Sequence, residues 1–206
     1  MENNKKKKRK VSFLGVLGVI MIVAGLTLIG KDFVVNYIER EQQKRDLQNF
    51  MNAPQLSDDE ELPEEATTGT VWGTIEIEKL DVNHLIMKSD DWSYLNRYVV
   101  AWERSVEPPL EGNFSIAGHN GRCASCVFRN FDKLENGDEV KISNKENTFV
   151  YKIYNIDDHV HYTDTSVLED TPGKTTLTLV TCTEQSTVNP WRTIVKAELV
   201  EVIPLT

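Results

Sequence analysis

The chain has 206 residues, 40% of them hydrophobic, which is enough for one folded domain with additional segments. Its net charge of -9 is unevenly distributed: residues 1–30 carry six basic side chains and one acidic one, which leaves 17 basic and 31 acidic residues in the remainder. Contacts to phosphate need basic patches, so this acidic body disfavours nucleic acid as a partner.

The N-terminal region has the pattern of a membrane anchor. Residues 1–10 form a basic tail, and residues 11–30 follow it without a single charge. As a helix, twenty residues span about 30 Å, the thickness of a bilayer core. A cleaved signal peptide is the alternative, but the apolar run is longer than a usual signal-peptide core and no A-x-A site follows it. We therefore expect a single-pass protein of the cell membrane, with a cytoplasmic N-terminus and an extracellular body.

Residues 31–70 are predicted to be a stalk and an acidic linker. The first half, through about residue 51, mixes charged side chains with apolar ones at helical spacing. Residues 52–70 hold two prolines, six acidic residues and few bulky apolar ones, the composition of a linker. The folded domain is therefore predicted to comprise residues 71–206.

From residue 71 the sequence indicates an all-β fold. Short segments alternate between apolar and polar residues or are rich in β-branched and aromatic residues. Two short helices are expected, one in 89–102 capped by Ser89 and one that begins near residue 128 and ends at Gly137. Many short strands with two small helices indicate a closed or nearly closed β-barrel. The predicted strands lie within 73–82, 112–119, 138–142, 148–162, 175–182 and 191–203.

Three residues at predicted strand ends could carry chemistry. Cys182 ends an alternating strand, where a thiol is fixed yet open to a substrate. His119 ends another strand and could exchange a proton near neutral pH, and Arg192 could stabilise a developing oxyanion. Each has an ordinary alternative: a buried inert cysteine, a structural histidine and a surface arginine. Together they form the set that an acyl-transferring enzyme needs.

These segments resemble a known family. The sequences TLVTC at 178–182 and SIAGH at 115–119, with Arg192 downstream, are similar to the signature elements of sortases, the membrane-anchored cysteine transpeptidases of Gram-positive cell surfaces. The resemblance covers about residues 71–206 and favours a class A-like enzyme, with class D as the closest alternative. It implies an eight-stranded sortase-type β-barrel with short helices behind an N-terminal transmembrane helix.

The resemblance also implies a reaction and its partners. Cys182 would cleave an LPxTG-type sorting signal of a surface protein between Thr and Gly, His119 would protonate the departing amine, and Arg192 would hold the substrate carbonyl or oxyanion. An amine of a cell-wall precursor would then accept the acyl group. By position, the substrate groove would include Ala117, Val167, Leu168 and Trp191.

The remaining cysteines leave other readings open. Outside the cell, Cys123 and Cys126 could pair with each other, leaving Cys182 over. Alternatively, His119 and the three cysteines have the ligand count of a structural zinc site, which would make the protein an anchored binding module. No metal or other cofactor is expected for the enzyme. Calcium is possible but not supported, because acidic residues near the predicted groove are usually just solvated; these are Asp157, Asp158, Asp164, Glu169 and Asp170.

Overall fold

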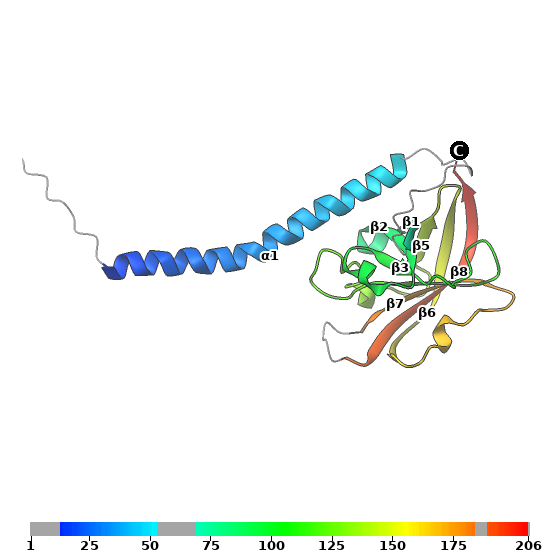
Figure 1. The fold of residues 1–206 in the computed structure, drawn as a ribbon. Helices are drawn as coiled ribbons and strands as arrows, with labels where there is room; N and C mark the ends of the chain where they lie inside the picture. Colours follow the sequence, from blue (N-terminus) through cyan, green and yellow to red (C-terminus); the bar gives the residue numbers. More distant parts are fainter. Residues whose placement is uncertain (1–12, 53–68, 184–188, 206) are drawn as a thin grey trace, which may run out of the picture. The chain divides into compact units, whose positions relative to one another are not determined.

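The computed structural model describes residues 13–52, 69–183 and 189–205 (Figure 1). The basic tail, the first two anchor residues and almost all of the predicted linker lie outside these ranges. The chain divides into two units, residues 1–38 and 39–206.

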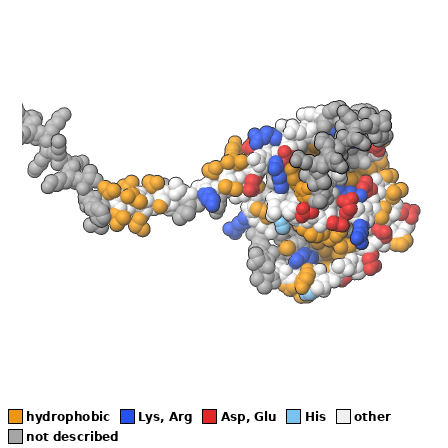
Figure 2. Space-filling model, viewed as in Figure 1, with side chains coloured by type: hydrophobic (Ala, Val, Ile, Leu, Met, Phe, Trp, Pro, Cys, Tyr) orange, Lys and Arg blue, Asp and Glu red, His pale blue; other side chains and the backbone are white. Residues whose placement is uncertain are grey.

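The N-terminal unit contains the first part of α1 (Phe13–Asn52), one helix through the regions predicted as anchor and stalk. Its apolar side chains are exposed, among them Val19, Met21 and Ile22, and they form the orange surface of this helix in Figure 2. Among the residues described, no helix is both long enough and apolar enough to cross a membrane.

The second unit contains a closed β-barrel, in agreement with the predicted fold class. Its strand order is β1-β2-β3-β4-β7-β8-β6-β5, with β5 returning to β1. Most pairs are antiparallel, and β2 with β3 and β4 with β7 are parallel. The strands are β1 (Gly69–Ile77), β2 (Val82–Ser89), β3 (Val99–Ala101), β4 (Gly112–Ala117), β5 (Glu139–Ser143), β6 (Asn147–His161), β7 (Thr175–Cys182) and β8 (Trp191–Pro204).

Alternation along the strands builds the core. Leu177 and Leu179 on β7 are fully buried, and they face Ala197 and Val195 on β8. Residues two apart share a face, so every second side chain of β7 points into the barrel. Other core residues include Ile75, Phe114, Ile142, Phe149 and Tyr151. Acidic and basic side chains are interspersed over the face of the barrel seen in Figure 2.

The two predicted helices are shorter than expected. In the first region the structure has a five-residue 3-10 helix, η2 (Trp92–Asn96), whose cap is Asp91 rather than Ser89. In the second it has only η3 (Phe131–Lys133), where Phe131 is buried and stacks on Phe128. Packing of these aromatic rings into the barrel outweighs helix propensity over so few residues. Two further 3-10 turns are η1 (Glu78–Leu80) and η4 (Ser166–Leu168).

Candidate active site

Cys182 is the last residue of β7 and is directly paired with Arg192 of β8. Their neighbours Thr181 and Thr193 form the adjacent cross-strand pair and point inward, with exposed fractions of 3% and 7%. Side chains alternate along a strand, so Cys182 and Arg192 both point to the outer face. Cys182 is partly exposed and is not in a disulfide. The thiol is therefore accessible on the face from which the Arg192 side chain also projects.

His119 reaches the same region from the other side of β7. Strand β4 runs parallel to β7, and its last pair joins Ala117 to Val180. The backbone N–H of Gly118 donates to the carbonyl of Val180 at 3.0 Å, and the Thr181 hydroxyl donates to the carbonyl of Gly118 at 2.8 Å. His119 follows at once, level with the end of β7. The backbone register thus places the three predicted residues at the same end of three adjacent strands, β4, β7 and β8.

The imidazole of His119 is half-buried. Burial disfavours the charged form and lowers the pKa of His119 below its ordinary value of 6.5. The neutral ring is thus favoured at neutral pH. A mechanism that uses the imidazolium as an acid must draw on a minor population.

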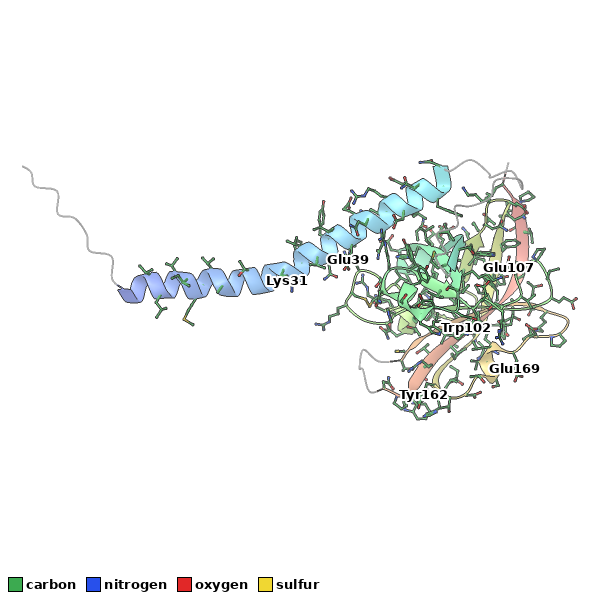
Figure 3. All side chains as sticks on the ribbon, in the orientation of Figure 1. Lys31, Glu39, Trp102, Glu107, Tyr162 and Glu169 are labelled. Atoms are coloured by element: carbon green, nitrogen blue, oxygen red, sulfur yellow. A yellow bond between two sulfur atoms is a disulfide. The ribbon has the colours of Figure 1, made fainter. Side chains whose placement is uncertain are left out.

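Arg192 is held in place by backbone and by one aromatic ring. Its Nη1 donates to the carbonyls of Asn189 and Trp191, both at 3.0 Å. The guanidinium carbon lies 5.8 Å from the ring centroid of Tyr162, a cation–π distance. Tyr162 lies in the segment between β6 and β7 (Figure 3), so Arg192 connects the start of β8 with this segment.

Comparison with known proteins identifies the family. The family model of the Sortase domain matches residues 75–200. The chain belongs to the sortase family. A Sortase A from Bacillus anthracis is 26% identical over 93% of this chain and 96% of its own length. This sortase is therefore a transpeptidase, one of the enzymes that anchor surface proteins to the cell wall.

Solved structures agree with this assignment. A Clostridium perfringens Sortase D5 transpeptidase is 35% identical, covering 77% of this chain and 98% of its own, with a TM-score of 0.65. The sortase A of Listeria monocytogenes is 27% identical, covering 66% of this chain and 91% of its own, with a TM-score of 0.60.

The predicted groove residues of this sortase occupy different places. Ala117 is buried at the end of β4 beside Val180. Val167 and Leu168 form part of η4 and are partly exposed. The side chain of Asn113, near the start of β4, fixes η4 by donating to the carbonyl of Val167 at 3.1 Å. These positions border the outer face of β4 and β7, and their role in binding stays a prediction.

Trp191 lies in a different environment from Arg192. It is 40% exposed, and its ring lies 5.7 Å from that of His159 and 5.6 Å from that of His161. As the residue before Arg192 on the same strand, it points to the opposite face of the sheet. Its assignment to the groove also stays a prediction.

Cys123 and Cys126 form a disulfide in the loop after His119. This pairing was one of the two alternatives drawn from the sequence, and it uses two of the four ligands of the zinc alternative. Among the described residues, no group of three or more His, Cys, Asp or Glu side chains is arranged to hold a metal ion. The disulfide therefore closes a short stretch of the loop that follows His119.

Sequence reasoning missed several residues that support this site. Tyr162 contacts Arg192, and Asn120 donates from its side chain to the carbonyl of Cys182 at 2.7 Å. Thr183 ties the end of β7 to β6 by donating to the carbonyl of Asp158 at 2.7 Å. The positions of Asn120 and Thr183 directly after His119 and Cys182 were their only signal in the sequence, and Tyr162 had none.

Proposed function

We propose that this sortase cleaves an LPxTG-type sorting signal between Thr and Gly and transfers the acyl group to an amine of a cell-wall precursor. The observation that carries the proposal is the pairing of Cys182 with Arg192 on one outer face, with His119 at the end of the parallel neighbour β4. A nucleophile, an acid and a fixed cation are the parts that acyl transfer requires.

In the first half-reaction the Cys182 thiolate attacks the carbonyl carbon of the substrate threonine. The carbon–sulfur bond forms, and the electron pair of the carbonyl moves to its oxygen, which Arg192 stabilises as an oxyanion. When the oxyanion collapses, the Thr–Gly bond breaks and its electron pair goes to the glycine nitrogen. That nitrogen takes the proton of the His119 imidazolium. A thioester on Cys182 remains.

In the second half-reaction the acceptor amine attacks the thioester. Neutral His119 removes a proton from the attacking nitrogen, the carbon–sulfur bond breaks, and the thiolate of Cys182 returns. The product is a new amide. The cycle ends with thiolate and imidazolium restored, so no cofactor is consumed.

The proposed subclass follows from comparison with the solved sortase structures. The sequence motifs favoured a class A-like enzyme, with class D as the alternative. The identity of 35% to the Clostridium perfringens sortase D5, against 27% to the Listeria monocytogenes sortase A, supports class D. Peptides that vary the third and fifth positions of the signal would show which signals the enzyme accepts.

We also propose that residues 11–30 anchor the enzyme in the cell membrane, with the catalytic domain outside. The proposal is supported by their lack of charge, the basic tail before them and the exposed apolar side chains of α1. Two leucine-to-arginine substitutions, Leu14→Arg with Leu17→Arg, should release the protein from the membrane fraction. Retention of the doubly substituted protein would contradict the anchor.

The test of the reaction uses the full chain in detergent with an LPxTG peptide and a panel of primary amines. Mass spectrometry should detect a product cut after threonine and joined to the amine, and a thioester on Cys182 when amine is omitted. Cys182→Ala is the control for cleavage by contaminants. Alkylation of Cys182 should abolish the reaction, whereas an intact peptide in every condition would contradict the proposal.

A further inference from the structure

The C-terminal end of β7 is held by side-chain hydrogen bonds as well as by the backbone hydrogen bonds of the barrel. Asn120 Nδ2 donates to the carbonyl of Cys182 at 2.7 Å and lies 3.3 Å from the carbonyl of Thr183. Asn120 directly follows His119. One side chain therefore connects the loop of the histidine with the backbone of the cysteine.

Thr183 is fixed from two further strands. Its hydroxyl donates to the carbonyl of Asp158 on β6 at 2.7 Å, and it accepts from the hydroxyl of Thr193 on β8 at 3.2 Å. Its backbone N–H donates to the carbonyl of Trp191 at 3.2 Å. We refer to Asn120, Thr183 and Thr193 as the β7 clamp.

The β7 clamp acts where regular pairing ends. Along β4 and β7, the last backbone bond before the site is the one from Gly118 to Val180. Cys182 lies two residues beyond Val180, and Thr183 is the last described residue before residue 189. Strand ends fray unless their backbone groups are bonded. The side-chain amide of Asn120 replaces the missing ladder bond between these strands.

We propose that Asn120 and Thr183 are positioning residues that set the distance between the Cys182 thiol and the His119 imidazole. This inference rests on the proposed reaction and names two residues that act on it through the backbone. The position needs a donor, because both groups that Asn120 contacts are carbonyl oxygens, and an amide nitrogen has two hydrogens for them.

A second observation supports a role beyond ordinary folding. The Oδ1 atom of Asn120 is buried and has no hydrogen-bond partner among the described residues. Within the part of the chain that the structure describes, the contacts of this amide are therefore all made by its donor end. The donor is the group that the Asn120 variants below remove.

The test compares four variants of the full chain. Asn120→Ala removes the donor, and Asn120→Asp places a carboxylate against two carbonyl oxygens. Thr183→Val removes the hydroxyl at nearly constant volume, and Thr183→Ser restores it. Asn130→Ala is the matched control, because Asn130 lines the same open pocket as Asn120 and Thr183.

Two readouts separate positioning from stability. Misplacing a reacting pair can lower the rate by up to about 10²-fold. We therefore expect kcat to fall about 10- to 100-fold in Asn120→Ala, further in Asn120→Asp, and about 10-fold in Thr183→Val. KM should stay within about twofold of the original value. The pH profile of Cys182 alkylation, which needs no peptide substrate, should shift in the Asn120 variants. Thr183→Ser and Asn130→Ala should resemble the original enzyme in both.

The proposal is overturned if Asn120→Ala retains kcat and the original alkylation profile, or if Thr183→Ser is as impaired as Thr183→Val. It is equally overturned if the losses scale with the fall in melting temperature while the alkylation profile stays fixed. Failure of the original enzyme to cleave the peptide, with the alkylation shift still present, would contradict the proposed substrate and leave the positioning role supported.

Discussion

Cys182 and Arg192 face each other as a directly paired couple across β7 and β8. Directly opposite residues in an antiparallel pair have Cβ atoms about 4.5–5.5 Å apart. The barrel therefore fixes the backbone positions from which the proposed nucleophile and cation project before any substrate arrives. Preorganisation of this kind is the main source of electrostatic stabilisation in enzymes.

Replacement of Cys182 by Ala should abolish both cleavage and transpeptidation while the fold persists. Among the described residues, no other thiol is available, because Cys123 and Cys126 are in a disulfide. Peptide turnover and the far-UV circular dichroism spectrum would check the two parts. Turnover near that of the original enzyme would end the sortase mechanism proposed here.

Loss of the Arg192 guanidinium should reduce kcat/KM strongly. Removal of one oxyanion donor typically costs about 10²–10³-fold. We expect this loss in Arg192→Ala and little recovery in Arg192→Lys, because lysine lacks the planar fork that bonds the carbonyls of Asn189 and Trp191. Steady-state kinetics of both variants would measure the change in kcat/KM. Full recovery in Arg192→Lys would show that charge alone suffices.

The pH–rate profile should be bell-shaped, with one limb from a thiol and one from an imidazole. Burial lowers the pKa of His119 below 6.5, so the imidazolium is lost as pH rises through that lowered value. The limb that reports His119 should therefore lie below pH 6.5. A profile of kcat/KM from pH 5 to 10 would measure both limbs, and a flat profile would contradict the pairing of His119 with Cys182.

The loop disulfide should matter little for chemistry. Cys123→Ser together with Cys126→Ser should leave the catalytic step nearly unchanged, because the base of the loop is closed separately by the Phe128 N–H donating to the carbonyl of His119 at 3.2 Å. Single-turnover kinetics under reducing and oxidising conditions would test this. A large loss of activity would assign the disulfide a direct part in placing His119.

The free energy of unfolding should decrease as the pH falls below 6.5, the ordinary pKa of histidine. His84 is buried, and this burial lowers the pKa of His84 below 6.5. Unfolding lets the ring take up a proton, so its contribution to stability is present above pH 6.5 and is lost as pH falls, by at most about 1.4 kcal/mol per pH unit. Denaturant unfolding at pH 8 and pH 5.5 should therefore differ less in His84→Gln. An equal pH dependence in both proteins would contradict this.

The sequence predicted local structure well where apolar periodicity was strong. Segments such as 112–119 and 175–182 contain the strands β4 and β7, because alternation of apolar residues is a property of neighbouring positions. The sequence predicted local structure poorly where packing between residues distant in sequence determines the conformation. The segment after Phe128 forms only a 3-10 turn, because Phe131 is drawn into the core.

The sequence by itself supplied a thiol, an imidazole and a guanidinium at three predicted strand ends, within motifs that indicate a sortase. Only the tertiary structure decided how they meet. The parallel pairing of β4 with β7 brings His119 to the end of β7 that holds Cys182, 63 positions later in the chain, and the register with β8 places Arg192 opposite Cys182. The same packing recruits Asn120, Tyr162 and Thr183, whose roles depend on contacts with residues distant in sequence, which local patterns do not encode.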